Sequence, residues 1–307
     1  MLTSYFNTSR LSNLLFSMGY LLVFLLLARW ESFSPWNWGT FFKEFLVIMV
    51  VMASLLAFNF IARKNILTQD NGYKTLFLAT LSCMLIPALE NSDLILANFF
   101  CLLAMRRIIS LKSQQNSIKK IFDASFLICL ASLFYFWAVL FLLLVYCGVF
   151  IHLRRFGNLY LIPVLALLTV ALLVTQVDLL LTDTFYKVQQ WVEPSQMDFS
   201  AYSDPSVFIP VSIIIALTIW PLFSYLGLIQ RTSGHNKSSL QLVLIWLLIA
   251  LGVAIMGETK NGGELLFLVP PMAIVLTNYI QNLGDKWFRE MILLLAILAP
   301  IGLLVFL

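Results

Sequence analysis

The chain has 307 residues, of which 61% are hydrophobic and only 11% are charged, and its formal net charge is +4. The mean hydropathy of +0.93 excludes a soluble globular domain, because such domains are only about half apolar. Apolar runs of about 18 residues or more, the length of a helix that crosses a bilayer, recur along the whole chain. We therefore expect an all-α, polytopic membrane helix bundle that forms a single domain over residues 1–307.

The sequence also argues against several classes of functional site. Its four cysteines lie inside apolar segments without a Cys-x-x-Cys pair, which argues against disulfides and zinc sites. The two histidines, His152 and His235, are too few for a haem or di-iron centre. No Walker A or Gly-x-Gly-x-x-Gly motif is present, so we expect no nucleotide hydrolysis. The small positive charge suits a membrane surface and does not indicate nucleic acid as a partner.

Eleven apolar segments are predicted to be membrane-spanning helices. Their approximate bounds are 12–29, 42–62, 75–89, 93–105, 121–136, 137–151, 158–181, 207–229, 239–256, 264–280 and 290–307. The third to sixth segments are short for a hydrocarbon core about 30 Å thick. Two buried hairpins with tight turns explain them best, and one long helix divided in the wrong place is the alternative. Pro270 and Pro271 lie within segment 264–280, where we expect them to kink the helix.

The charges alternate between the turns. With the N-terminus in the cytoplasm, fifteen of the nineteen Lys and Arg residues fall on the cytoplasmic side, and only Arg29, Lys43, Lys187 and Lys260 fall outside. Short cytoplasmic loops are enriched in Lys and Arg, so we expect a cytoplasmic N-terminus and an outer C-terminus. Eleven of the fifteen carboxylates lie at the outer face. Because acidic residues contribute little to topology, this excess is a first indication of function.

The first polar cluster on the outer face is the turn between segments 75–89 and 93–105. Glu90 and Asp93 stand three residues apart there, a spacing at which two side chains can point to one side. They are candidates for a catalytic or substrate-binding pair. The alternative is a solvated turn in which Asp93 caps the following helix.

The second cluster is the long outer segment 182–206, in which aromatic residues alternate with carboxylates. Residues 183–192 can form an amphipathic helix in the membrane interface, a depth that Trp and Tyr favour. Tyr186 and Trp191, with carboxylates nearby, also suit a carbohydrate, whose C–H faces stack on aromatic rings. An interfacial cap over the bundle is the alternative.

The third cluster is the glycine-rich turn 257–264, in which Lys260 is the only cation and Glu258 is one of the carboxylates. A lysine at the outer mouth of a helix can hold a phosphate as a point charge. The glycines allow a ligand to approach the backbone closely. The alternative is a flexible turn whose lysine anchors it at the interface.

The order of these parts resembles that of the polyprenyl-phosphate-dependent membrane glycosyltransferases of the GT-C fold. The resemblance rests on Glu31 in the first outer loop, Asp93 at the start of its span, the segment 182–206, and Lys260 before Leu265-Leu-Phe-Leu-Val-Pro-Pro. It implies glycosyl transfer from a lipid-linked sugar donor at the outer face of the inner membrane. Glu31 or Asp93 would then be the base, and Lys260 would hold the donor phosphate. The chain departs from that family in having a single first-loop glutamate, which is crowded by tryptophans.

The chain also looks like an uncharacterised family of bacterial multi-pass inner-membrane proteins. This resemblance rests on Asn98-Phe-Phe-x-Leu-Leu-Ala-x-Arg106-Arg107 and on Lys120-Ile-Phe-Asp123-Ala-Ser125, and it implies no activity. The residues themselves place Asp123 just inside segment 121–136, at its cytoplasmic boundary. We expect a structural ion pair with Arg106 or Arg107 across the short inner turn, with a proton relay or a substrate contact as the alternative.

Two functions compete with glycosyl transfer. The scarcity of ionisable groups inside the apolar segments favours a non-enzymatic scaffold in an envelope assembly or export complex, with membrane lipids and envelope proteins as partners. A transporter is the third function, with Asp178 near the outer end of segment 158–181 as its only candidate residue. The enzymatic interpretation depends on whether Glu31, Asp93 and Lys260 converge in space.

Overall fold

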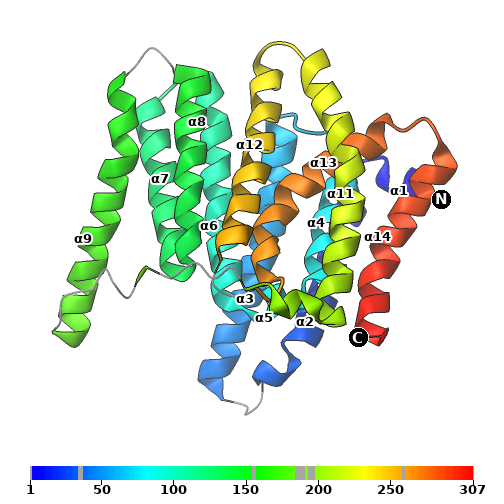
Figure 1. The fold of residues 1–307 in the computed structure, drawn as a ribbon, viewed down its shortest axis with the longest axis horizontal. Helices are drawn as coiled ribbons and strands as arrows, with labels where there is room; N and C mark the ends of the chain where they lie inside the picture. The colour runs from blue at the N-terminus through cyan, green and yellow to red at the C-terminus, as the bar shows by residue number, and fades with distance from the viewer. Residues whose placement is uncertain are drawn as a thin grey trace.

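The fold is a bundle of helices. The computed structural model describes residues 2–33, 37–153, 157–183, 191–192, 198–257 and 260–306. Within these ranges every regular element is a helix (Figure 1). Nine of the described helices are long and apolar enough to cross a membrane. The expected all-α, polytopic architecture is therefore confirmed.

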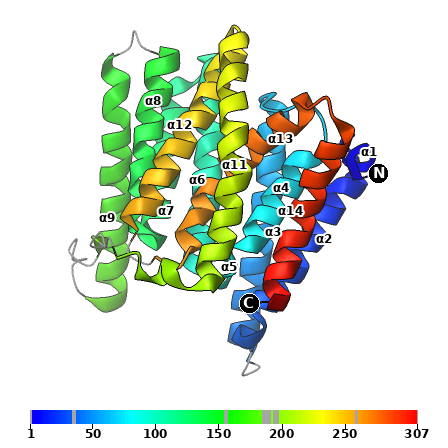
Figure 2. The ribbon, with the colours of Figure 1, turned by 45° about the vertical axis from the view of Figure 1, so that its right-hand side comes forward.

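Successive long helices run up and down the bundle (Figures 1 and 2). The α-helices are α1 (Leu2–Phe6), α2 (Leu11–Ala28), α3 (Trp38–Lys64), α4 (Tyr73–Met84), α5 (Ile86–Glu90), α6 (Ser92–Ile109), α7 (Ser117–Phe134), α8 (Leu142–Leu153), α9 (Ile162–Thr182), α11 (Pro205–Arg231), α12 (His235–Met256), α13 (Val269–Asn282) and α14 (Lys286–Phe306). The 3-10 helices are η1 (Trp30–Phe33), η2 (Ser110–Ser113), η3 (Phe136–Phe141), η4 (Gly157–Leu161), η5 (Ser200–Ser203) and η6 (Gly263–Leu268).

The short predicted segments correspond to short or divided helices. Segment 75–89 is divided at Leu85 into α4 and α5, and a proline stands in the first turn of α5. Segments 121–136 and 137–151 are α7 and η3–α8, with Tyr135 in an extended conformation between them. The helices α4, with twelve residues, and α7, with three charges among its 18 residues, are not among the nine apolar helices.

The proline pair Pro270-Pro271 does not kink a helix, so that expectation was wrong. The segment begins as the 3-10 helix η6, and the two prolines occupy the first turn of α13. A proline in the first turn removes no hydrogen bond, because an amide there has no partner within the helix. The segment is thus a 3-10 helix followed by an α-helix.

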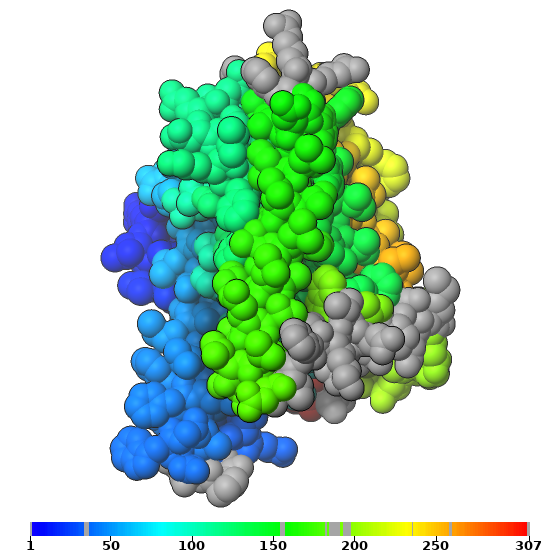
Figure 3. Space-filling model, turned by 90° about the vertical axis from the view of Figure 1, so that its left-hand side faces the viewer, coloured from blue at the N-terminus to red at the C-terminus, as the bar shows by residue number. Residues whose placement is uncertain are grey.

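The helices α4, α6 and α13 form the centre of the bundle (Figure 2). Every residue of α4 is buried, and α4 packs against α2, α3, α13 and α14. The helix α9 lies at the edge, where it packs chiefly on α7 and stands outermost on the face shown in Figure 3. Apolar side chains on such peripheral helices are exposed, as expected for surfaces in contact with lipid.

The two ends of the bundle carry different residues. We call the basic end the one that contains the turns 65–72, 110–116, 232–234 and 283–285 with the helix ends that they join (Figure 1). We call the Lys260 end the opposite one, which contains residues 29–33, 91, 198–204 and 257–262 where described. At the Lys260 end, α2 and α3 project beyond the other helices (Figure 2). Exposed tryptophans lie near both ends, Trp30 and Trp38 at one and Trp287 at the other, as is typical of membrane interfaces.

The N-terminal helix is fixed to the last helix of the chain. The amide of Leu2 and the hydroxyl of Thr3 donate to the two carboxylate oxygens of Glu290, each at 2.7 Å. Glu290 lies in the second turn of α14, at the basic end, and the chain ends at the far end of that helix. The two ends of the described chain therefore lie at opposite ends of the bundle.

Candidate functional site

Two glycines shape the turn that carries Lys260. Gly257 ends α12 beside the hydroxyl of Tyr135, and a Cβ atom at this position would clash with that hydroxyl. Gly262 has a φ of +86°, a left-handed conformation that glycine adopts without strain. The predicted site residue Glu258 lies outside the described residues, as does Tyr186 of segment 182–206.

Lys260 is buried, with 5% of its surface exposed. Its ammonium donates to the carbonyl oxygens of Ala254 at 2.7 Å and Ile255 at 2.6 Å, in the last turn of α12. A cation there satisfies carbonyls that lack a helical partner and offsets the negative end of the helix dipole. These contacts use two of the three ammonium N–H groups.

Glu264 is completely buried in the first turn of η6. Its Oε1 accepts a hydrogen bond from the hydroxyl of Tyr202 at 2.7 Å. Its Oε2 has no hydrogen-bond partner among the described residues. Glu264 was not among the site residues predicted from the sequence. The available signal was its position between a glycine-rich turn and an apolar run, where an ionisable group needs a partner or a function.

The segment around η5 covers both charged groups. The Phe199 ring lies with its centre 5.3 Å from the Lys260 ammonium, and Tyr202 donates to Glu264. The segment is joined to α11, whose N-cap Asp204 accepts a hydrogen bond from the amide of Ser206 at 3.1 Å. This one segment therefore contacts both the carboxylate and the ammonium.

Burial shifts the pKa of two of these side chains. It lowers the pKa of the Lys260 ammonium from its ordinary value, and the negative charge of Glu264 acts in the opposite direction. Burial raises the pKa of the Tyr202 phenol, and its hydrogen bond to Glu264 adds to this effect. Tyr202 therefore stays protonated at neutral pH and serves as a hydrogen-bond donor to the carboxylate.

The predicted carboxylates Glu31, Glu90 and Asp93 lie at the Lys260 end with exposed side chains. Glu31 is on η1, at the projecting junction of α2 and α3. Asp93 is not the cap of α6, because the side chain of Asn91 accepts from the amide of Asp93 at 2.9 Å and from the next amide. No hydrogen bond or ion pair among the described residues links these three carboxylates to Lys260.

A buried ion pair that was not predicted from the sequence lies next to these carboxylates. Arg29 donates through two nitrogens to the two oxygens of Glu44, at 2.5 and 2.9 Å. Its third nitrogen donates to the carbonyls of Leu89 at 3.0 Å and Glu90 at 2.6 Å. The pair thus joins α2, α3 and the end of α5. The available signal was Glu44 inside an apolar segment, because a carboxylate there requires a partner.

Trp191 lies beside an apolar groove between α7 and α9. Its indole Nε1 donates to the carbonyl of Ser132 at 2.8 Å, and its ring packs edge to face on Phe136 with centroids 5.2 Å apart. The groove has a volume of about 170 Å³, and its lining includes Leu133 and Val174. Phe136 directly follows Tyr135, whose hydroxyl lies beside Gly257. The groove and the turn that carries Lys260 are thus connected through the neighbouring residues Tyr135 and Phe136.

The predicted structural ion pair lies at the basic end. The carboxylate of Asp123 lies 3.1 Å from the guanidinium of Arg107, and the pair joins α6 to α7. Arg106, the other expected partner, lies instead with its guanidinium 4.8 Å from the centre of the Phe60 ring. Because Asp123 and Arg107 are both about half exposed, their pair contributes little to stability.

Comparison with known proteins gives a family without an activity. No curated protein and no solved structure matches the chain. Residues 5–307 match the sequence model of DUF6427, which is described as a family of unknown function. Because this match covers nearly the whole sequence, the protein belongs to the DUF6427 family.

Proposed function

We propose that this protein is a membrane glycosyltransferase that takes a sugar from a polyprenyl-phosphate carrier at its Lys260 end. The observation that carries the proposal is the burial of a carboxylate, Glu264, and an ammonium, Lys260, beneath one short segment. Ionisable groups buried in membrane proteins usually have a functional reason. A carboxylate can serve as the base and a cation can hold the phosphate in such a transfer.

Glu264 is the general base in the proposed reaction. The oxygen of an acceptor hydroxyl forms a bond to C1 of the sugar, and its proton passes to Oε2 of Glu264. The bond between C1 and the phosphate oxygen breaks, and its electron pair leaves with the polyprenyl phosphate. Lys260 donates its remaining N–H to that phosphate and stabilises the developing charge. Tyr202 holds Oε1 and so orients the carboxylate.

Substrate access requires the segment around η5 to move. Phe199 and Tyr202 cover the two charged groups, so the closed arrangement excludes water from them. Segments that open and close over an active site commonly do so in microseconds to milliseconds. An ordered cover of this kind fits an enzyme whose lipid-linked donor is easily lost to hydrolysis.

The apolar groove between α7 and α9 is the proposed site for the start of the polyprenyl chain. It faces the membrane at the edge of the bundle and reaches Trp191, which offers an aromatic face to a sugar. Tyr186 is proposed to contribute a second aromatic face. The exposed carboxylates Glu31, Glu90 and Asp93, together with Glu258, are proposed to contact the acceptor.

We also propose that the protein lies in a bacterial inner membrane with its basic end in the cytoplasm. The concentration of Lys and Arg at that end supports this orientation, because short cytoplasmic loops are enriched in both residues. The Lys260 end then faces outward. Single cysteines at positions 31 and 286 test the orientation. We expect an impermeant thiol reagent added to intact cells to label position 31 and not position 286, and the reverse pattern contradicts it.

The experiment that tests the proposed function is sugar transfer in membrane vesicles. Vesicles containing the wild-type protein receive a radiolabelled polyprenyl-phosphate hexose, and the label that leaves the lipid is measured. We expect Glu264→Gln to reduce transfer by about 100-fold or more, the scale of general-base catalysis, at an unchanged protein level. The amide still accepts a hydrogen bond from Tyr202, so the fold has little reason to change.

A matched control separates loss of the base from loss of charge. Asp285→Asn neutralises an exposed carboxylate at the basic end and should leave transfer unchanged. Glu31→Gln and Asp93→Asn are run beside it. If either of these variants loses sugar transfer while Glu264→Gln retains it, the substituted carboxylate is the base. That result would contradict the role of Glu264.

A non-catalytic scaffold is a second candidate function, favoured by one observation. The Lys260 ammonium already binds two carbonyls of α12, and Glu264 already binds Tyr202, so both groups can serve packing alone. A scaffold predicts that Glu264→Gln lowers thermal stability or co-purification of an envelope partner. It also predicts that vesicles with the wild-type protein transfer no more label than vesicles without it.

A further inference from the structure

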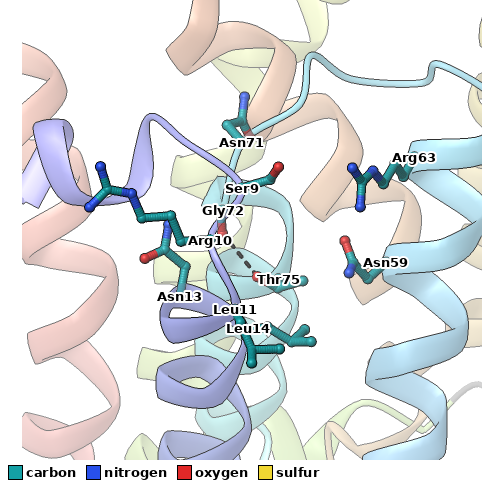
Figure 4. Close-up of a pocket in the computed structure, with 10 residues that line it drawn as sticks. All are labelled: Ser9, Arg10, Leu11, Asn13, Leu14, Asn59, Arg63, Asn71, Gly72 and Thr75. Carbon is teal, nitrogen blue, oxygen red and sulfur yellow. Dashed lines mark hydrogen bonds between the residues drawn. The ribbon is translucent and has the colours of Figure 1, made fainter.

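Two polar pockets lie on opposite sides of α3 at the basic end. The first, of about 230 Å³, lies between α2, α3 and the start of α4 (Figure 4). Figure 4 shows Arg63 and Asn59 of α3 pointing toward α2 and α4, and the guanidinium of Arg10 turned away from Arg63. Arg63 also pairs with Asp70 at 3.4 Å. The positive charge that faces this pocket is therefore largely offset.

The second pocket, of about 280 Å³, is lined by positive charge that is mostly not offset. Five cations line it, and none of the lining residues is acidic: Lys64, Arg106, Arg107, Lys112 and Lys120. Asp123, which is not part of the lining, pairs with Arg107. Mutual repulsion makes such a group of like charges unfavourable when the pocket is empty, and an anion relieves that repulsion.

The lining also offers donors in fixed positions. The ammonium of Lys120 donates to the carbonyl of Ser110 at 2.8 Å and the hydroxyl of Ser113 at 2.6 Å, which leaves one N–H. Lys64 and Arg106 lie over the same Phe60 ring, at 5.3 and 4.8 Å from its centre. These contacts hold three cations in place around the pocket before any ligand binds.

An apolar track leads from the pocket along α3. Phe60, beneath the two cations, is 43% exposed, and Leu56, one turn earlier on the same face of the helix, is 45% exposed. A soluble anion would gain nothing from this track. An amphiphile with a charged head and apolar chains would use both features.

We propose that this pocket binds the phosphate of an anionic phospholipid head group, with the acyl chains along Leu56 and Phe60. Lys64, Arg106 and Lys120 are the proposed phosphate ligands, and Arg107 and Lys112 add positive potential. Basic pockets between membrane helices on the cytoplasmic side are suited to such head groups. The site lies at the opposite end from Lys260 and is independent of glycosyl transfer.

The test uses the full-length protein in a neutral detergent. Phosphatidylglycerol or phosphatidylcholine is added, and both the bound lipid, by native mass spectrometry, and the midpoint of thermal unfolding are measured. We expect phosphatidylglycerol to be retained and to raise the midpoint, and phosphatidylcholine to do neither. Each of Lys64→Gln and Arg106→Gln should weaken retention of phosphatidylglycerol roughly fivefold, and the triple variant with Lys120→Gln should abolish it.

A matched control removes three charges from the same end but outside the pocket, with Arg63→Gln, Arg231→Gln and Lys286→Gln combined. This control should retain phosphatidylglycerol as the wild type does. Equal loss in the control would show attraction to the whole basic end and overturn the proposal. If soluble glycerol phosphate raises the midpoint of thermal unfolding as much as phosphatidylglycerol does, the pocket binds a free phosphate and not a lipid. That result would overturn the proposal. If the triple pocket variant does not fold, the two single variants decide the outcome.

Discussion

The two ends of this protein differ in how many of their charged groups are buried and bound within the chain. At the Lys260 end the charged groups Arg29, Glu44, Lys260 and Glu264 are buried and bound to other parts of the chain. At the basic end Lys74 is buried, but most cations, such as Arg63, Lys64, Arg106 and Arg107, are exposed. Their carboxylate partners, where present, lie at the surface. The number of charged residues at an end therefore does not indicate what they do. Whether each charged group is buried is the more informative property.

The physical reason lies in desolvation. A buried ion pair contributes little net stability, but the removal of one partner leaves an uncompensated charge away from water. An exposed pair loses almost nothing when it is broken, because water replaces the partner. Substitution of the buried charges at the Lys260 end should therefore affect folding or activity. Substitution of the exposed cations at the basic end should change stability little and affect mainly ligand binding.

The largest effect is expected for Arg29→Met. This change leaves Glu44 buried without its partner and removes two donors to the end of α5, so it should cost about 3–5 kcal/mol. The measurement is thermal unfolding in detergent together with the yield of monodisperse protein. The double variant Arg29→Met/Glu44→Met should recover part of the loss. A double variant less stable than the single one would contradict the pairing.

The next effect is expected for Gly257→Ala. The new Cβ clashes with the Tyr135 hydroxyl, and such overpacking typically costs about 1–3 kcal/mol. Combination with Tyr135→Phe removes the hydroxyl and should restore part of the stability. Thermal unfolding of the two single variants and the double variant gives the coupling. Strictly additive losses would show that the two residues do not touch.

A smaller and pH-dependent effect is expected for Tyr202→Phe. Loss of its hydrogen bond to a charged group should cost about 1–2 kcal/mol near neutral pH. The pKa of this phenol is raised in the folded state, so its contribution is complete below about pH 10. Above that value the unfolded phenol ionises first and the contribution falls.

Thermal unfolding from pH 7 to pH 11 measures this dependence. The difference in stability between the wild type and Tyr202→Phe should shrink as the pH rises above about 10. The other tyrosines are common to both proteins and cancel in the comparison. A constant or growing difference would contradict a raised pKa at this position.

The smallest effect is expected for Arg63→Gln. Its pair with Asp70 spans 3.4 Å and both side chains are more than half exposed, so the loss should be below about 1 kcal/mol. Thermal unfolding in low and in high salt measures it, because screening weakens exposed pairs further. A loss of stability as large as that of Arg29→Met would contradict the proposed difference between buried and exposed ion pairs.

The sequence was sufficient for the architecture because each predicted segment is apolar over a length that only a helix can satisfy in lipid. The sequence did not predict the division of the helix at Leu85 or the change from a 3-10 helix to an α-helix just before Pro270-Pro271. An interrupted helix and a kinked helix have the same apolar pattern. Lys260 was selected from its turn, and the structure adds that its ammonium binds the end of α12.

The partners of the buried charges could not be read from the sequence. Arg29 contacts the carbonyl of Glu90 across 61 residues of chain, and Tyr202 contacts Glu264 across 62. Such pairings depend on how helices distant in the sequence are placed. Asp123 and Arg107 flank one short turn, so their proximity followed from local geometry. Arg29 and Glu44 are likewise only 15 residues apart, and it is the contact of Arg29 with α5 that the sequence could not indicate.

Hydrogen–deuterium exchange with added ligand tests the central claim, a lipid-linked sugar site at the Lys260 end, most directly. A polyprenyl-phosphate hexose should change exchange in residues 198–204 and 260–268, where η5 covers Lys260 and Glu264, and Glu264→Gln should still show this change. Phosphatidylglycerol should change exchange only near residues 56–64 and 106–120, which form the proposed lipid site. A response to the lipid-linked sugar confined to residues 56–64 and 106–120, or none at all, would contradict a sugar site at the Lys260 end.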